Sequence, residues 1–401
     1  MVEPVQTPGQ TVKNLDKLKP YPFERLRAQF AGVKHTGGLA HINLSIGEPK
    51  HPTPALIKQA MVEHLDGLAV YPGTQGIPAL RQAISAWILK RFDAQLDPET
   101  QVLPILGSRE ALFAFAQVVL DGCQSGCNVV FPNPFYQIYE GASFLGGAQP
   151  VYVNIQANGL PNFHELPAEV LQQTRLMYVC SPNNPTGAVY TLGDWQALFD
   201  LADQHGFVIA SDECYSEIYM DGDKPPIGGL EAASRLGRSD FNNLIVFSSL
   251  SKRSNAPGLR SGYVAGDADL IKAFLRYRTY HGSAMSNTVQ MASIAAWGDE
   301  HHVAENRRLY TEKFKSFQQI LAGKLDLQIP AAGFYFWAKL NESDTEFATR
   351  LFEQAHVTVL PGSFLGREVN GVNPGCNHIR IALVASKDEC DEAAHRIRNI
   401  L

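Results

Sequence analysis

The feature that most constrains the fold of this chain is a series of short apolar runs separated by stretches with helical spacing. The four clearest runs are Asn128 to Phe131, Leu176 to Val179, Phe207 to Ala210 and Leu244 to Phe247. Stretches such as Leu192 to Gln204 lie between them and show apolar residues at helical spacing. Runs of this length without polar alternation are typical of strands buried on both faces, so the sequence predicts an α/β fold: a three-layer sandwich around a mostly parallel sheet.

Polar clusters follow three of these expected strands directly. They are Ser181 to Gly187, Asp212 to Tyr215 and Ser248 to Lys252. Ligands of open α/β sheets bind at the carboxyl ends of the strands, where such clusters meet. We therefore expect the three clusters to form one site.

The pattern changes after about Gly298. A helical stretch from His302 to Gly323 is followed by strand-like pieces and a last helix, which is typical of a smaller α+β domain. We predict a large domain over residues 50–299 and a discontinuous small domain made of 1–49 and 300–401. In the large domain we predict two helices, one over Ile77 to Phe92 and one from Ser108 to Asp121, with Ser108 as the N-cap of the second.

Charge and composition exclude several classes of protein. The 34 basic and 40 acidic residues give a net charge of −6, which argues against nucleic acid or an anionic membrane as partner. The first 20 residues lack the order of a secretory signal, and no run is long enough to span a membrane, so we expect a cytoplasmic protein. Of the six cysteines only Cys123 and Cys127 lie close together; we expect free thiols and no metal site.

Lys252 is the first candidate for chemistry. A lysine directly after a buried strand is unusual, and desolvation or a neighbouring cation lowers the pKa of an amine, so that its neutral, nucleophilic form is populated. An exposed lysine in a polar loop is the plain alternative. Ser249, Ser251 and Arg260 lie within eight residues of Lys252 and could bind a phosphate, which favours the functional interpretation.

A second phosphate-binding element is expected at Ser108 and Arg109. They lie where a loop turns into a helix, and backbone N–H groups at a helix N-terminus favour an anion, although an ordinary N-cap would look the same.

Asp212, at the end of a strand, could keep the ring nitrogen of a pyridine cofactor protonated. Tyr215 and Asn184 could hydrogen-bond the phenolic oxygen of such a ring, although Asn184 also begins a good turn sequence.

These motifs together resemble the fold type I pyridoxal-phosphate (PLP) aminotransferases, the aspartate aminotransferase superfamily. The resemblance rests on Asn184-Pro-Thr-Gly187, Asp212-x-x-Tyr215, Ser249-x-Ser-Lys252 with Arg260, and Asn377-His-Ile-Arg380, and it extends from Ser45 to Arg380. It implies that PLP is the cofactor, that small amino and keto acids are the substrates, and that Lys252 bonds to the cofactor and moves the substrate proton. Ser108, Arg109, Ser249, Ser251 and Arg260 would hold the phosphate, and Asp212, Tyr215 and Asn184 would contact the ring.

The resemblance assigns further roles. Tyr136 would stack on the ring, with Phe135 as a competitor, and Arg380 with Asn184 and the backbone at Gly47 would hold the substrate carboxylate. Tyr71 would reach the phosphate of a neighbouring subunit, so a homodimer with shared active sites is implied. A surface arginine and a turn glycine are the alternatives for Arg380 and Gly47.

The substrate is less constrained. The segments Lys19 to Leu26 and Leu44 to Pro54 resemble the N-succinyl-LL-diaminopimelate aminotransferases of bacterial lysine synthesis. Lys50 could face a distal succinyl carboxylate or could simply be solvated. A simple dicarboxylic amino acid would need a second arginine to bind its side-chain carboxylate, and Arg278 is the candidate for that role. An aspartate- or alanine-type aminotransferase and a C–S lyase remain alternatives, whereas a PLP-sensing regulator would need a DNA-binding segment for which the chain has little room.

Overall fold

A seven-stranded sheet forms the centre of the computed structural model, which describes residues 14–35, 37–123, 126–220 and 222–401. The strand order is β2-β8-β7-β6-β5-β3-β4, and β8 alone runs antiparallel to its two neighbours. The strands are β2 (Val102–Ile105), β3 (Asn128–Asn133), β4 (Gln149–Asn154), β5 (Thr174–Cys180), β6 (Val208–Asp212), β7 (Leu244–Ser249) and β8 (Gly262–Gly266). The expectation of a mostly parallel sheet is confirmed.

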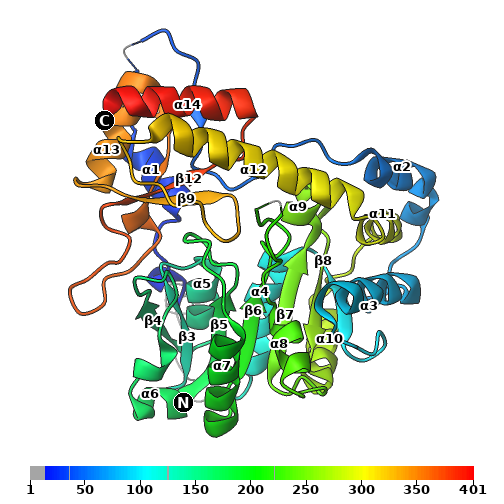
Figure 1. Ribbon diagram of the computed structural model, residues 1–401. Coiled ribbons are helices and arrows are strands. Elements are labelled where there is room, and N and C mark those ends of the chain that lie inside the picture. Colours follow the sequence, from blue (N-terminus) through cyan, green and yellow to red (C-terminus); the bar gives the residue numbers. More distant parts are fainter. Residues whose placement is uncertain (1–13, 36, 124–125, 221) are drawn as a thin grey trace, which may run out of the picture.

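Helices cover both faces of this sheet (Figure 1). Along β5, Met177 and Val179 pack into a core shared with α3 and α7, while Leu176 and Tyr178 pack into a second core with α4 and α5. Because successive side chains of a strand point to opposite faces, the two cores give three layers. The helices of this part are α2 (Ala55–Glu63), α3 (Pro78–Phe92), α4 (Ser108–Val119), α5 (Ile138–Leu145), α6 (Ala168–Gln173), α7 (Leu192–His205), α8 (Gly229–Arg235), α9 (Leu250–Arg253), α10 (Ala268–His281) and α11 (Asn287–Trp297).

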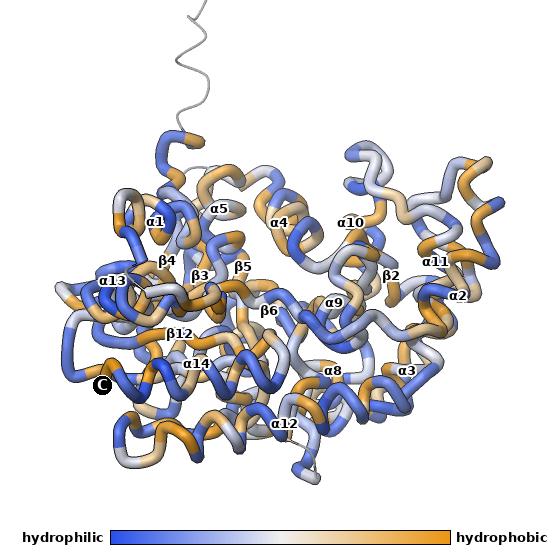
Figure 2. Tube along the Cα trace, turned by 90° about the horizontal axis from the view of Figure 1, so that it is seen from above, coloured by the Kyte–Doolittle hydropathy of each residue, from blue (hydrophilic) through white to orange (hydrophobic). Residues whose placement is uncertain are grey.

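The two ends of the chain build a smaller unit with its own hydrophobic core. Its strands are β1 (Ile42–Asn43) paired in parallel with β10 (Val357–Thr358), and an antiparallel sheet of β11 (Leu360–Pro361), β12 (His378–Ala382) and β9 (Tyr335–Lys339). Its helices are α1 (Pro22–Gln29), α12 (His301–Leu321), α13 (Asp344–Ala355) and α14 (Lys387–Ile400). Figure 2 shows polar and apolar stretches alternating along α12 and α14, as expected of helices with one face on a core.

The pairing of β1 with β10 joins the N-terminal segment to the C-terminal part of the chain. This arrangement is consistent with a small domain of 1–49 and 300–401 beside a large domain of 50–299, although the exact boundaries stay a prediction. Short 3₁₀ turns connect the larger elements: η2 (Leu15–Lys17), η3 (Leu65–Ala69), η4 (Phe163–Glu165), η5 (Pro257–Leu259) and η6 (Gly362–Phe364). Among the described residues, no helix combines the length and the apolar character needed to cross a membrane.

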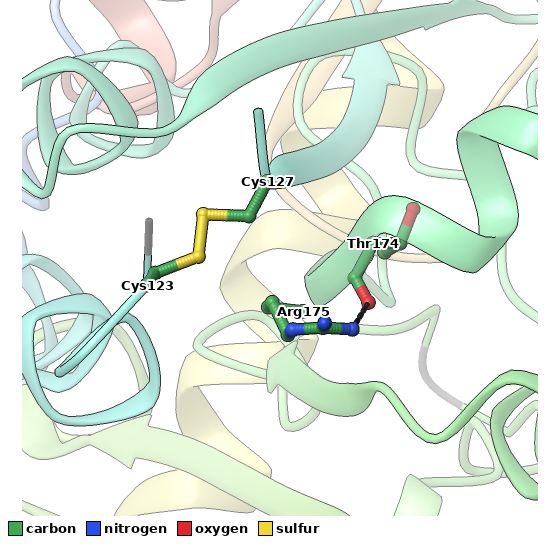
Figure 3. The surroundings of a disulfide bond; sticks show 4 residues. All are labelled: Cys123, Cys127, Thr174 and Arg175. Atoms are coloured by element: carbon green, nitrogen blue, oxygen red, sulfur yellow. Dashed lines mark hydrogen bonds between the residues drawn. A yellow bond between two sulfur atoms is a disulfide. The ribbon is translucent and has the colours of Figure 1, made fainter. Parts of the chain in front are cut away.

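Two local predictions were wrong. Ser108 is the first residue of α4 and Gly107 is its N-cap; the φ of Gly107 is +81°, a conformation that side chains disfavour. Cys123 and Cys127 form a disulfide rather than free thiols (Figure 3). The turn before β3 brings their Cα atoms to 6.5 Å, within the span of a disulfide, which spacing in the sequence did not reveal.

Candidate active site

A cavity of about 500 Å³ lies where the carboxyl ends of β5, β6 and β7 meet the smaller unit. It collects side chains from segments as far apart in the sequence as Tyr21 and Arg380, as expected for a site at the carboxyl edge of an α/β sheet. The predicted site residues that line it are Gly47, Ser108, Arg109, Tyr136, Asn184, Asp212, Tyr215, Ser249, Ser251, Lys252, Arg260 and Arg380. Of the predicted set, only Tyr71 lies elsewhere.

Lys252 enters the cavity from α9, directly after β7. Its Nζ donates a hydrogen bond of 2.6 Å to the backbone oxygen of Gly47 and lies 5.4 Å from the centre of the Phe334 ring. Burial lowers the pKa of the Lys252 amine to about 8, and the nearby Arg380 acts in the same direction. The neutral, nucleophilic form of the amine is therefore accessible close to neutral pH.

Asp212 is the last residue of β6 and is almost completely buried. Its Oδ2 accepts a hydrogen bond of 2.9 Å from the Tyr139 hydroxyl, and its Oδ1 accepts one of 3.3 Å from the backbone N–H of Cys214. Burial raises the pKa of this carboxyl. Asp212 lines the cavity, and no ion pair within the described ranges involves it.

Arg380 reaches the cavity from β12. One Nη donates to Asn184 Oδ1 at 3.0 Å and the other to the backbone oxygen of Ser45 at 2.8 Å. The guanidinium also lies 4.3 Å from the centre of the Tyr335 ring, and its Nε is buried without a hydrogen-bond partner. A planar donor that is fixed on two sides and has an unused N–H can bind a carboxylate.

Hydroxyl and guanidinium groups gather at the N-terminus of α4. The Ser108 Oγ accepts from the Cys214 thiol at 2.9 Å, and the same thiol lies 3.8 Å from the Ser249 Oγ. Arg260 donates to the backbone oxygen of Leu106 at 3.2 Å, just before this helix begins. These donors surround the end of a helix whose first N–H groups are free to bind an anion.

Gly107 is required for this arrangement. A Cβ atom at position 107 would lie 2.2 Å from an Nη of Arg260, which is far inside van der Waals contact. Gly47 is constrained in the same way, because a Cβ there would lie 1.9 Å from the Tyr335 hydroxyl oxygen. Both glycines therefore allow a functional side chain to pack against backbone.

These residues fit PLP on two structural observations. The anion-binding end of α4, with Ser108, Ser249 and Arg260, matches a phosphate group. The buried, unpaired carboxylate of Asp212 matches a protonated ring nitrogen. Lys252 lines the same cavity and can reach an aldehyde bound there.

Arg109 and Tyr136 occupy another wall of the cavity. Arg109 Nε donates to the Tyr136 hydroxyl at 2.6 Å, and an Nη donates to the Tyr21 hydroxyl at 3.3 Å. No ion pair of the described residues includes Arg109. Tyr136 lines the cavity, whereas the competing Phe135 is buried among Phe131 and Tyr152 and does not.

Three residues considered from the sequence are absent from the cavity of the single chain. Tyr71 is fully exposed, Lys50 is exposed outside the cavity, and Arg278 is buried with its Nη1 2.7 Å and 2.9 Å from the two carboxylate oxygens of Glu110. Of the two interpretations of Lys50, the structure therefore favours the solvated side chain. Arg278 is unavailable to a substrate because Glu110 neutralises it.

The structure adds residues that the sequence did not indicate. Tyr139 joins Asp212 to α5, Cys214 joins it to Ser108 at the start of α4, and the hydroxyl of Tyr335 lies 2.9 Å from that of Tyr215. Cys214 lies within the Asp212 to Tyr215 cluster, so its position was a weak signal. Tyr139 lies three residues after the predicted Tyr136, which was a similarly weak signal, and Tyr335 comes from a distant segment and had none.

Comparisons with known proteins agree with this geometry. A family model described as aminotransferase class I and II matches residues 40–397. A curated LL-diaminopimelate aminotransferase of Dehalococcoides mccartyi is 32% identical, covering 96% of this chain and 98% of its own. A crystal structure of an aminotransferase from Neisseria meningitidis has a TM-score of 0.93 and 51% identity, with 96% and 98% of the two chains covered. The structure titled probable N-succinyldiaminopimelate aminotransferase from Thermus thermophilus has a TM-score of 0.81 and 26% identity, with 95% and 99% covered.

The match to the family model spans most of the chain, and the curated relative exceeds 30% identity over nearly its whole length. Together with a cavity that fits the cofactor, these findings establish the class of enzyme. The chain belongs to the class I and II aminotransferases, which are PLP-dependent transaminases.

Proposed function

We propose that this enzyme transfers an amino group between glutamate and an acid with the diaminopimelate skeleton, with N-succinyl-LL-diaminopimelate as the expected product. The observation that carries the proposal is that the cavity holds two arginines besides Arg260 at its phosphate end. These are Arg380 and Arg109, and neither is neutralised by a carboxylate in the described residues. Glutamate and the diaminopimelate acids all carry a second carboxylate, so one arginine is available for each end. The names of the relatives support the same substrate class.

Lys252 is the proposed catalytic residue. When bound, PLP supplies an electron sink that allows the bond between the substrate Cα and its hydrogen to break. The Lys252 amine, whose pKa is lowered to about 8, would take the proton from the substrate Cα and deliver it to C4′ of the cofactor. The backbone oxygen of Gly47 holds this amine in position through its hydrogen bond.

Asp212 and its neighbours would hold the ring. The Asp212 carboxylate keeps a proton at the ring nitrogen, because a buried carboxylate with a raised pKa gains most from a cationic partner. The hydroxyl of Tyr215 and the amide of Asn184 would contact the phenolic oxygen, and Tyr136 would lie against the ring. Ser108, Ser249, Ser251 and Arg260 bind the phosphate at the N-terminus of α4.

Arg380 would bind the substrate α-carboxylate together with Asn184 and the backbone at Gly47. A two-pronged contact fixes the rotation of the substrate about its Cα, so that the Cα–H bond stands perpendicular to the ring. Arg109 would bind the distal carboxylate, with the Tyr136 and Tyr21 hydroxyls orienting its guanidinium. This role replaces our expectation of a phosphate contact for Arg109, since its N–H groups are directed at the two phenols.

A homodimer with shared active sites is part of the proposal. Tyr71 is fully exposed and lies beside the exposed apolar side chains of Leu65, Leu68 and Val70, with exposed fractions of 51%, 69% and 62%. An apolar patch of this kind on a single chain is typical of a protein interface. A second copy would cover it and would bring Tyr71 to the phosphate of the neighbouring site.

A spectroscopic screen tests the substrate. Glutamate should bleach the visible absorption of the PLP-loaded enzyme, and the correct keto acid should restore it. We expect the succinylated amino-oxopimelate to restore the band fastest, whereas faster recovery with the non-succinylated acid would support the free LL-diaminopimelate substrate. Recovery only with pyruvate or oxaloacetate would contradict the proposal.

The distal arginine has its own test. Arg109→Leu should raise the KM for glutamate by roughly 10-fold or more while the reaction with alanine changes little, because a charge-assisted hydrogen bond contributes about 1.5–3 kcal/mol. Arg276→Leu on α10, an exposed arginine outside the cavity, is the control. Equal loss with both amino donors would assign Arg109 to the cofactor instead.

A further inference from the structure

One face of α12 carries polar and aromatic side chains at helical spacing, and we call these residues the α12 stripe: His302, Asn306, Tyr310 and Lys313. The last three are buried, with exposed fractions of 2%, 0% and 2%. Residues three and four apart lie on one side of a helix, so the stripe points in one direction. Figure 1 shows α12 (yellow) running from the smaller unit across to α9, which carries Lys252.

Asn306 is the centre of this stripe. Its Nδ2 donates to the backbone oxygen of Lys252 at 3.3 Å. Its Oδ1 lies 3.1 Å from the donating Nδ2 of Asn255 and 2.8 Å from Nδ1 of His51. A single buried amide therefore contacts the catalytic lysine, the turn behind it and a third segment of the chain.

The backbone of Lys252 needs such an external partner. Helix α9 has only four residues, and the last carbonyl groups of a helix have no donor within it. The turn after it passes through Asn255, whose φ is +47°, a strained conformation that surrounding contacts must hold. The α12 stripe supplies these contacts, since His302 Nε2 also lies 2.9 Å from Ser254 Oγ.

The same amide is linked to the other end of the lysine side chain. Lys252 Nζ donates to the backbone oxygen of Gly47, and the chain continues from Gly47 to His51, which contacts Asn306. Two residues further on, the hydroxyl of Thr53 donates to the backbone oxygen of Asn255 at 2.6 Å. Asn306 thus holds the backbone of Lys252 directly. Through His51 it also holds the segment that contains Gly47, whose backbone oxygen accepts the hydrogen bond from Lys252 Nζ.

The contacts determine the protonation of His51. An amide oxygen only accepts, so His51 Nδ1 carries the hydrogen, and its Nε2 is left to accept from Lys313 Nζ at 2.6 Å. Lys313 also donates to the backbone oxygen of Leu383. A second proton on His51 would face the Lys313 ammonium and is excluded.

Other titratable groups around His51 and Lys313 act in both directions. Burial lowers the pKa of His51 and Lys313 acts in the same direction, whereas Glu305 acts in the opposite one. Around Lys313, Lys50 lowers the pKa of its amine, and Glu389 and Cys390 raise it. Neither Glu305 nor Glu389 forms an ion pair with His51 or Lys313 in the described part of the chain, so His51 keeps its two contacts, to Lys313 and to Asn306.

We propose that Asn306 is a positioning residue for Lys252, held in place by His51 and Lys313, and that it couples the position of α12 to the placement of the catalytic amine. The proposal rests on the role of Lys252 in the proposed function. It goes beyond that role because it makes the environment of the amine depend on a side chain that touches neither cofactor nor substrate. Movement of α12 relative to the large sheet would then change the reactivity of Lys252.

The test compares Asn306→Leu and Asn306→Asp with Gln318→Leu. Gln318 is a matched control because its Nε2, on the same helix, donates to the backbone oxygen of Leu327, away from the cavity. We expect Asn306→Leu to lower kcat with glutamate by roughly 10- to 100-fold with little change in KM, since small displacements of reacting groups have effects of this size. Asn306→Asp keeps the acceptor for His51 but loses the donor to Lys252, and should reproduce most of this loss.

The second readout is the pH titration of the visible absorption in the PLP-loaded protein, with amine-reagent labelling of Lys252 in the cofactor-free protein as a further measure. Both midpoints should move in the Asn306 variants by about one pH unit and stay unchanged in Gln318→Leu. Unchanged midpoints and kcat in a folded Asn306 variant would overturn the proposal. If Asn306→Leu does not fold, His51→Phe provides the same comparison.

The proposed function is checked separately in the same experiment. Borohydride reduction of the wild-type protein with PLP should label Lys252 irreversibly. Absence of that label would refute the role of Lys252 itself. Presence of the label together with wild-type behaviour of all Asn306 variants would refute only the positioning role.

Discussion

Lys313 provides a quantitative test of the electrostatics in this structure. Its ammonium is buried, contacts His51 and the backbone oxygen of Leu383, and has no carboxylate partner among the described residues. Burial lowers the pKa of this lysine from 10.5 to about 8. A difference of that size corresponds to about 3 kcal/mol of destabilisation of the folded state when the group is charged in both states.

The sign of the effect follows from the two pKa values. Below pH 8 the lysine is charged in the folded and the unfolded chain, and the folded state bears the full penalty. Between pH 8 and 10.5 only the unfolded chain binds the proton, so the penalty declines as pH rises and is absent above 10.5. Lys313→Met removes this penalty but also removes two hydrogen bonds worth about 1 kcal/mol each.

We therefore expect Lys313→Met to raise the free energy of unfolding by about 1 kcal/mol at pH 7 and to lower it by about 1–2 kcal/mol near pH 10. Urea unfolding of the PLP-loaded enzyme at the two pH values measures this difference. Lys315→Met, which changes an exposed lysine on the same helix, should have little effect at either pH. Equal destabilisation of Lys313→Met at both pH values would refute the reasoning, because packing alone would then explain it.

Three further outcomes follow from the site. Gly107→Ala should weaken PLP binding by at least about 10-fold, because its Cβ displaces Arg260 and its positive φ becomes strained; equilibrium dialysis measures this, and unchanged affinity would place the phosphate elsewhere. Asp212→Asn should lower the rate of the glutamate half-reaction by roughly 100-fold or more, since an amide cannot hold the charged ring nitrogen; stopped-flow absorbance tests it against the wild type. Labelling of Lys252 by an amine reagent in the cofactor-free protein should rise through about pH 8, and a midpoint near 10.5 would contradict the effect of burial.

The central strands were predictable where apolar runs are uninterrupted, as in β5 and β7. Strand β8 was missed because it begins and ends with glycine. A Cβ at Gly262 would lie 2.3 Å from the oxygen of Ser248, and one at Gly266 would lie 2.1 Å from the oxygen of Leu244. The close approach of β8 to β7 thus demands the residues that weaken an apolar pattern. β4 is partly exposed at the sheet edge, and β2 contains Pro104, so neither carries a clear run.

The site was predictable where its residues follow strands, because the sheet brings strand ends together whatever the loops do. The contacts of Asn306 were not predictable in this way. They join α12 to Lys252 across 54 residues and to His51 across 255, and nothing local in the sequence distinguishes Asn306 from a solvent-facing asparagine. Residues that act through another residue carry no motif of their own, whereas those that touch a cofactor recur in recognisable clusters.

The choice between Arg278 and Arg109 shows why counting arginines cannot identify the one that reads a distal carboxylate. Arg278 binds the carboxylate of Glu110, and this pair is already satisfied, so a substrate would have to displace a charged partner from a buried position. Arg109 precedes Glu110 on α4 but faces the cavity, where two neutral hydroxyls orient its guanidinium without cancelling its charge. Under our proposal, a substrate carboxylate that reaches Arg109 would gain a charge-assisted hydrogen bond without displacing a charged partner. Two adjacent residues of α4 therefore have opposite effects. Glu110 binds Arg278 and makes it unavailable to a substrate, whereas Arg109 lines the cavity and is available to one.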